Sequence, residues 1–214
     1  MNIIDLSPND PNLLEQAARL LVDAFRAHWP NAWPDMDSAR EEVREALEAE
    51  KIARAALDEG GALLGWIGAI PQYETFGWEL HPLVVAPASQ GRGVGRALVA
   101  DLEAQVRTRG GTTIYLGTDD EDNMTSLSGV NLYPNVWEHI ARIHNLKGHP
   151  YEFYQKQGYV ITGVIPDANG PGKPDILMAK FVGKQWMSFR RSRLAATEKS
   201  RKRQKDFSPR CGSK

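Results

Sequence analysis

The chain of 214 residues lacks the features of a secreted or membrane-spanning protein. It has a single cysteine, Cys211, which excludes a disulfide bond within the chain. No apolar stretch approaches the roughly 18 residues that a membrane-spanning helix needs. The first residues, Met1 to Asp5, carry neither the basic start nor the apolar run of a secretory signal. We therefore expect a soluble, cytoplasmic protein in a reducing compartment.

The sequence also lacks an internal repeat and any cluster of His, Cys and carboxylate residues at metal-ligand spacing, so we expect no metal. Hydrophobic residues make up 42% and charged residues 25% of the chain, which is enough for an ordinary packed core. This length is typical of one domain, with room for an appendage.

The net charge of −1 conceals two opposite charges. Residues 184–214 hold 11 of the 26 Lys and Arg and 2 of the 27 Asp and Glu, which gives +9. Residues 1–183 keep 15 basic and 25 acidic residues, which gives −10. An acidic body is suited to a cationic ligand, while a basic tail is suited to an anionic surface.

Hydrophobic periodicity predicts a mixed sheet with flanking helices, an α/β (α+β) fold. We expect strands over residues 2–6, 52–58, 62–71, 77–85, 112–118, 159–166 and 175–181. We expect helices over 11–27, 38–48, 93–108 and 136–146, and a short helix from His149 to Gly158. Residues 1–182 should form one domain. Residues 183–214 lack core periodicity and should be a basic C-terminal extension, flexible or partly helical.

A glycine-rich turn joins the strand at 77–85 to the helix at 93–108. Its glycines allow the backbone to approach a ligand closely, and the helix N-terminus presents free N–H groups to an anion. Arg92 and Arg96 add positive charge within an acidic body. The pattern indicates phosphate binding, although a tight connection without a ligand would have a similar sequence.

This turn resembles the acyl-CoA pyrophosphate loop of the GNAT N-acetyltransferase superfamily, through Gln90, Gly93 and Gly95. The segment from Phe153 to Tyr159 resembles the second signature of that family. Longer blocks resemble the enterococcal-type chromosomal aminoglycoside 6′-N-acetyltransferases. They include residues 68–73, 77–85, 114–120, 149–154 and 168–180, and the likeness extends over about residues 1–182.

The resemblance implies acetyl transfer from acetyl-CoA to the 6′-amino group of an aminoglycoside, which confers resistance, and it implies a homodimer. In the family, a β-bulge in the strand before the loop frees backbone groups that hold the pantetheine arm. The resemblance therefore implies these cofactor-binding residues: Leu83, Val84, Val85, Gln90, Gly91, Arg92, Gly93, Val94, Gly95, Arg96, Asn123 and Tyr154.

Attack of an amine on a thioester needs a proton acceptor, a donor to the oxyanion and a proton for the leaving thiolate. We expect Glu79 to be the base, with His81 on the same strand face tuning it, relaying a proton or contacting the substrate. The resemblance assigns the oxyanion donor to the Leu83 N–H. Tyr154 has a phenolic proton to give to the thiolate. Each of these residues could instead be structural.

The run Asp119-Asp120-Glu121-Asp122 follows a predicted strand and would attract a polycation. We expect Asp119, Asp120, Asp122 and Glu79 to bind substrate ammonium groups, and Trp29 and Tyr73 to stack on sugar rings or line the cleft. The alternatives are a solvated acidic loop and aromatic core residues.

Two other functions stay open. A GNAT enzyme could acetylate another polyamine or a protein amine. Separately, the basic tail could bind a nucleic acid or an anionic membrane, with a strong salt dependence.

Overall fold

The computed structural model describes residues 1–184. Residues Met1–Val182 form one compact unit. The predictions made for the basic extension therefore fall almost entirely outside the described residues.

Within residues 1–184 the chain forms seven strands and five α-helices, with three short 3₁₀ turns. None of these helices is long and apolar enough to cross a lipid bilayer. In chain order the elements are β1 (Asn2–Asp5), α1 (Pro11–Phe25), α2 (Met36–Ala46), β2 (Ile52–Leu57), β3 (Leu63–Gln72), β4 (Gly77–Val85), α3 (Val94–Thr108), β5 (Thr113–Asp119), α4 (Val136–Ala141), α5 (Tyr151–Lys156), β6 (Val160–Ile165) and β7 (Asp175–Phe181).

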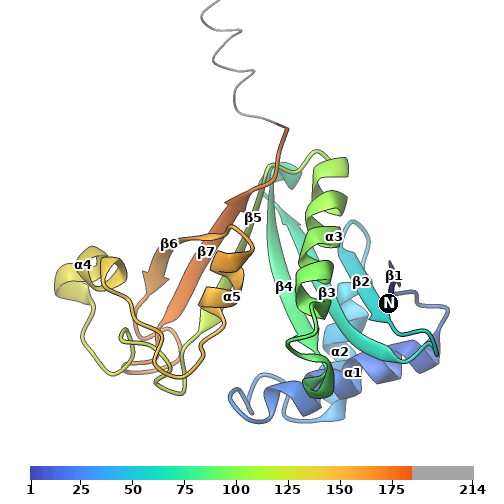
Figure 1. The fold of residues 1–214 in the computed structure, drawn as a ribbon, viewed down its shortest axis with the longest axis horizontal. Helices are drawn as coiled ribbons and strands as arrows, with labels where there is room; N and C mark the ends of the chain where they lie inside the picture. Colours follow the sequence, from blue (N-terminus) through green and yellow to red (C-terminus); the bar gives the residue numbers. More distant parts are fainter. Residues whose placement is uncertain (185–214) are drawn as a thin grey trace, which may run out of the picture. The chain divides into compact units, whose positions relative to one another are not determined.

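The strands form one sheet in the order β1-β2-β3-β4-β5-β7-β6. All neighbours are antiparallel except β4 and β5, which are parallel and pair only through Gly77–Glu79 and Thr113–Tyr115. Beyond this short junction the two strands diverge, as Figure 1 shows. The divergence divides the sheet into a β1–β4 half and a β5–β7 half.

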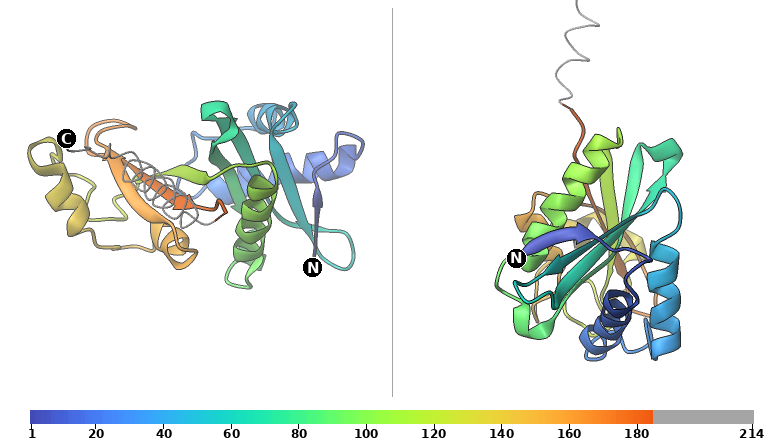
Figure 2. Two further views of the ribbon diagram at one scale, coloured as in Figure 1. Left: turned by 90° about the horizontal axis from the view of Figure 1, so that it is seen from above. Right: turned by 90° about the vertical axis from the view of Figure 1, so that its right-hand side faces the viewer.

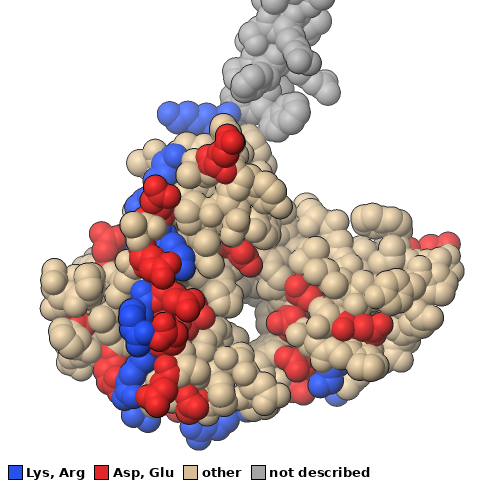
Figure 3. All heavy atoms as spheres, turned by 180° about the vertical axis from the view of Figure 1, so that it is seen from behind, with Lys and Arg blue, Asp and Glu red and all other residues tan. Residues whose placement is uncertain are grey.

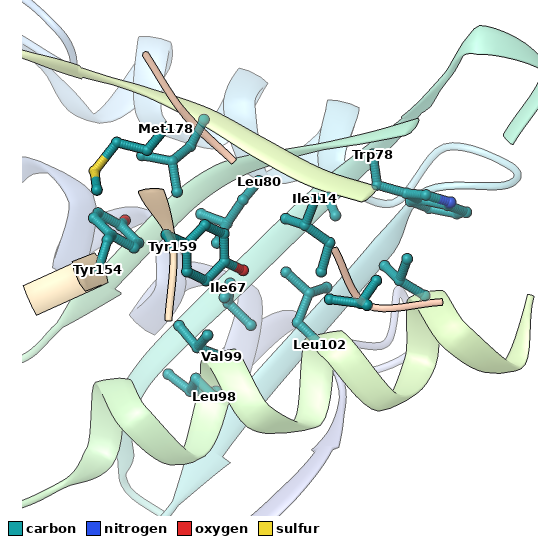
Figure 4. Close-up of a cluster of buried hydrophobic side chains, with 14 of the residues drawn as sticks. Ile67, Trp78, Leu80, Leu98, Val99, Leu102, Ile114, Tyr154, Tyr159 and Met178 are labelled. Carbon is teal, nitrogen blue, oxygen red and sulfur yellow. The ribbon is translucent and has the colours of Figure 1, made fainter. Parts of the chain in front are cut away.

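Two hydrophobic clusters cover the two faces of the sheet. One packs α3 and α5 against the sheet and includes Trp78, Leu98, Leu102, Ile114 and Met178, several of which are drawn in Figure 4. The other packs α1 and α2 against the opposite face of the β1–β4 half. The second view in Figure 2 separates these two layers of helices.

The predicted mixed sheet and most element bounds are confirmed, including the strands at 77–85 and 175–181. The side chain of Asp10 caps α1, accepting from the Leu13 N–H at 3.0 Å. The helix expected over 136–146 is wrong in its length, because α4 ends at Ala141. The chain after it pairs instead with the loop at Met124–Ser126, through Leu146 N–H to the Met124 carbonyl at 2.8 Å and a Thr125–Asn145 bridge.

Candidate active site

A cavity of about 670 Å³ lies where β4 and β5 diverge. The loop after α1, the middle of α2, the second half of β4, the end of β5 and the start of α5 all contribute to its wall. The lining brings together residues that are far apart in the sequence: Trp29, Trp33, Glu42, Leu80, His81, Pro82, Leu83, Val84, Val85, Gln90, Gly117, Thr118, Asp119, Glu121, Tyr154 and Asn169.

A β-bulge shapes the β4 wall of this cavity. Ile67 of β3 pairs with Leu83, whereas Ala69 pairs with Leu80, so two residues of β4 stand opposite Gly68 alone. Gly68 permits this approach, because a Cβ there would lie 2.4 Å from the His81 carbonyl oxygen. The extra residue reverses the alternation of side chains, so that Leu83 and Val85 face the same cluster as Leu80.

The bulge also leaves backbone groups of β4 turned toward the cavity. The Ala86 N–H donates to the Leu64 carbonyl of β3 at 2.9 Å. Successive residues of a strand direct their backbone groups to opposite edges. The backbone groups of Val85 and Leu83 therefore point away from β3, toward the edge of β4 at which β5 no longer pairs. The Val85 carbonyl there accepts from Gln90 Nε2 at 3.3 Å. The Leu83 N–H thus points to the edge of β4 that borders the cavity.

The glycine-rich turn has a backbone conformation that favours glycine at two positions. Gly91 and Gly93 have φ of +70° and +86°, and Gly93 is the N-cap of the 15-residue helix α3. No side chain caps this N-terminus, so its first N–H groups are open to a ligand. Arg92 and Arg96 are exposed beside it. Val94 buries its side chain in the core and offers only its backbone.

The α5 helix presents Tyr154 to the cavity from the other half of the sheet. The side chain is 8% exposed, and its ring lies 5.7 Å from that of Tyr159. Figure 4 shows the two tyrosines side by side next to Met178. Burial raises the pKa of Tyr154 far above its ordinary value, so the phenol keeps its proton at neutral pH.

Glu79 lies just outside the cavity wall, one residue before Leu80. Its Oε2 accepts from the Tyr115 hydroxyl at 3.4 Å, because the parallel pairing places Glu79 and Tyr115 directly opposite each other. Burial and the nearby Glu79 charge raise the pKa of Tyr115 to about 12. Tyr73, 77% exposed, contacts Tyr115 with its ring at 6.4 Å but does not line the cavity.

His81 faces the same side of β4 as Glu79, since Leu80 between them packs in the core. Its Nε2 lies 3.5 Å from Glu42 Oε2 of α2, and its ring lies 5.9 Å from that of Trp33. The bond to Glu42 raises the pKa of His81, burial opposes this, and the charges of Glu42, Glu79 and Asp119 raise it further.

The acidic run at the end of β5 does not act as one patch. Asp119 lines the cavity, but Asp120 is 0% exposed, and its carboxylate accepts from the N–H groups of Met124 and Thr125 at 2.7 and 2.8 Å. The expectation that Asp120 binds substrate is therefore wrong, because its carboxylate is buried and bonded within the loop. Its carboxylate closes a loop instead. Glu121, for which the sequence predicts no substrate contact, also lines the cavity.

Asp122 is also engaged away from the cavity wall. Its Oδ2 lies 2.8 Å from Nδ1 of His28, in the loop after α1. Next to this contact, Trp29 Nε1 donates to the Asp119 carbonyl at 3.2 Å. These two contacts connect the β1–β4 half to the β5–β7 half, and Trp29 lines the cavity.

Asn123 does not reach the cavity either. It lies in the loop after the acidic run with a φ of +54°, and its Oδ1 is close to Gly129. The position expected to contact the cofactor therefore holds a turn residue. Asn169, by contrast, lines the cavity and donates to the Asp119 carboxylate at 2.5 Å.

A further carboxylate, which no sequence motif predicts, lies beside the site. Asp175 of β7 is the direct strand partner of Asp119, and a Cβ on Gly117 would lie 2.4 Å from its Oδ2. Burial, together with the charges of Asp119 and Glu79, raises the pKa of Asp175 to about 6. No local motif marks it, because its neighbours come from another strand. Figure 3 shows acidic side chains around the opening between the two halves, while the Lys and Arg visible on this face lie mainly in a stripe to one side.

A family profile and several solved structures match this chain. The profile of the family described as "Acetyltransferase (GNAT) family" matches residues 14–133. A search of curated proteins found no match.

Three solved structures are similar over most of their length. An aminoglycoside 6′-N-acetyltransferase complexed with coenzyme A is 49% identical, with a TM-score of 0.79. The aminoglycoside 6′-N-acetyltransferase from Enterococcus faecium is 46% identical, with a TM-score of 0.78, and an aminoglycoside 6′-acetyltransferase type Ii is 44% identical, with a TM-score of 0.66. Each comparison covers 86% of this chain and 99% of the other.

Proposed function

The chain belongs to the GNAT acetyltransferase family, and from this we propose that it transfers the acetyl group of acetyl-CoA to the 6′-amino group of aminoglycosides, which confers resistance. The observation that supports this most is the make-up of the cavity wall. Gln90 lines the cavity and leads into the glycine turn and the uncapped N-terminus of α3, while the carboxylates of Glu42, Asp119 and Glu121 also line the cavity. We expect the anionic cofactor to lie toward the glycine turn, at the cofactor end, and the polycationic acceptor to lie near the carboxylates, at the acceptor end.

The residues supply each step of a direct transfer. The acceptor amine loses a proton to Glu79, directly or through water, and its nitrogen attacks the thioester carbonyl. The Leu83 N–H stabilises the resulting oxyanion. As the C–S bond breaks, Tyr154 gives its proton to the CoA thiolate, and the nitrogen gives its remaining extra proton to the Tyr154 phenolate or to water, which leaves a neutral amide and free CoA. No covalent enzyme intermediate is needed.

The cofactor end would hold acetyl-CoA mainly through backbone groups. The amides from Gly91 to Arg96 would contact the pyrophosphate, and Leu83 with Val85 would bond the pantetheine arm. Gly95 has a packing reason as well, because a Cβ there would meet the Phe153 ring at 3.3 Å. The placement of Arg92 and Arg96 adds attraction for the anion.

CoA release measured with acetyl-CoA and kanamycin tests the proposal. We expect turnover with aminoglycosides that carry a 6′-amine and none with an analogue that has a 6′-hydroxyl in its place. Spermidine and a basic peptide serve as competing acceptors, because a selectivity ratio in kcat/KM separates this function from that of a general polyamine or protein acetyltransferase. Absence of turnover with every 6′-amino aminoglycoside would refute it.

We also propose that the protein is a homodimer. Large apolar side chains are exposed on the β5–β7 half, at and near the edge strand β6: Tyr133 is 67% and Trp137 68% exposed, and Val160 is 61% exposed. An apolar edge of this kind is typical of an interface. Trp137→Glu is expected to convert a dimer into a monomer in light scattering, and a wild-type mass of one chain would contradict the proposal.

A further inference from the structure

We propose that Glu42 of α2 is a positioning residue for acetyl transfer, which fixes the orientation and protonation of the His81 imidazole. The inference rests on the proposed function, because it takes His81 to be part of the active site. Glu42 lies 39 positions before His81 and belongs to no motif of the strand, the glycine turn or α5.

The helix that carries Glu42 is fixed at its start. The Asp35 side chain accepts from the Ser38 N–H at 2.9 Å, and the Ser38 hydroxyl interacts with the Asp35 backbone in return, which forms a capping box. Val43, next to Glu42, is 2% exposed in the cluster on this face of the sheet. A helix anchored in this way presents its Glu42 carboxylate from a defined position.

The imidazole of His81 is held from two sides. Glu42 Oε2 lies 3.5 Å from its Nε2, and the Trp33 ring packs at 5.9 Å with an interplanar angle of 39°. All three residues line the cavity. Engagement of Nε2 by Glu42 leaves Nδ1 as the ring nitrogen that a substrate or water can use. The same carboxylate thus selects which nitrogen takes part in the reaction.

Glu42 is ionised in this setting. Burial raises the pKa of Glu42, but bonds with His81 and Trp33 and the charge of Lys51 outweigh it, so that its pKa falls below the ordinary value. The carboxylate is therefore a permanent negative charge beside the ring. A protonated imidazole so held would disfavour a second positive charge nearby and would favour the neutral, nucleophilic form of the incoming amine.

The charged groups that face His81 are Glu42 on α2, Glu79 on β4 and Asp119 on β5. Together they extend the pH range over which the imidazole keeps its proton. With the folded pKa of His81 above its unfolded value, the pair stabilises the fold fully below the unfolded pKa, and this contribution is lost as the pH rises through the folded pKa.

The test is Glu42→Gln, which keeps the shape of the side chain and removes its charge. We expect the NMR titration midpoint of His81 to fall and the pH profile of kcat to move in the same direction. We expect kcat near neutral pH to decrease about tenfold, as for partial loss of a proton-transfer group. The KM for acetyl-CoA should not change, because Glu42 is not among the residues proposed to hold the cofactor.

Glu45→Gln is the matched control. It removes the same charge from the same helix, at an exposed position without a bond to His81. Glu42→Asp retains the charge and should keep the His81 midpoint nearer to the wild-type value, and thermal unfolding of each variant excludes a folding defect. An unchanged midpoint, or equal effects of Glu42→Gln and Glu45→Gln, would overturn the inference.

The NMR titration also separates this inference from the proposed function. If the wild-type protein acetylates no aminoglycoside and the His81 midpoint still falls in Glu42→Gln, the coupling of the two residues stands while the proposed function fails. If aminoglycosides are acetylated and kcat of Glu42→Gln equals that of the wild-type protein, the proposed function stands and Glu42 is not a positioning residue.

Discussion

Glu79→Gln is expected to lower kcat/KM for the acceptor amine about a hundredfold, the lower end of what a positioned acid or base contributes. Glu79 combines proximity to His81 with a direct bond from Tyr115, so its carboxylate is held at the rim of the cavity. The amide of Gln keeps the bond from Tyr115 but cannot accept a proton from an ammonium group. CoA release as a function of pH measures the effect.

Glu74→Gln provides the control for this experiment. Glu74 is exposed, lies five positions earlier in the chain and has no bond to Tyr115. It therefore reports the loss of one negative charge near the acceptor end without loss of the proposed base. Similar kcat/KM values and pH profiles for Glu79→Gln and wild-type protein would remove Glu79 from the mechanism.

Gly68→Ala is expected to damage both stability and activity, because it adds a single methyl group at the most crowded point of β3 and β4. That methyl carbon would lie 2.4 Å from the His81 carbonyl oxygen and 3.4 Å from Pro82 Cδ. The obstacle is backbone, so it cannot be relieved by rotating a side chain. We expect a loss of about 2 kcal/mol in the free energy of unfolding, typical of overpacking.

The same substitution should affect catalysis through the bulge. Relief of the clash must displace β4 at His81, which shifts the Leu83 N–H from the reacting carbonyl. Misplacement of about 1 Å can reduce a rate roughly a hundredfold. Thermal unfolding and CoA release measure the two effects.

Gly163→Ala is the matched control for Gly68→Ala. It also lies in a strand at a register shift, but its added methyl group would meet only Leu177 Cδ1 at an ordinary 3.8 Å. A Gly68→Ala protein with the melting temperature and kcat/KM of the wild type would show that the bulge tolerates a side chain.

The parts of the fold that sequence could predict are those fixed by local patterns. Alternating and helical periodicity located β4, β7, α3 and α1. The helix over 136–146 failed because residues after Ala141 find backbone partners in the loop at Met124, which no local pattern specifies.

The candidate site divides in the same way. Residues on one strand or turn, such as His81, Leu83 and Gln90, could be assigned to the cavity from their motif. Glu42, Tyr115 and Asp175 could not, because their nearness to the site comes from packing between separate elements. Four consecutive carboxylates suggested one anionic patch, but the turn of the chain buries Asp120 and directs its neighbours differently.

The short junction between β4 and β5 has a consequence for cooperativity. Only three residue pairs continue the hydrogen-bond ladder across the middle of the sheet. Beyond them, cohesion of the two halves depends on side-chain packing under α3 and on the loop contacts of His28 and Trp29. A ligand seated in the gap joins two segments of the fold that the backbone leaves apart. Ligand binding therefore also stabilises the folded state, by about 2.7 kcal/mol when the free ligand concentration is a hundred times Kd.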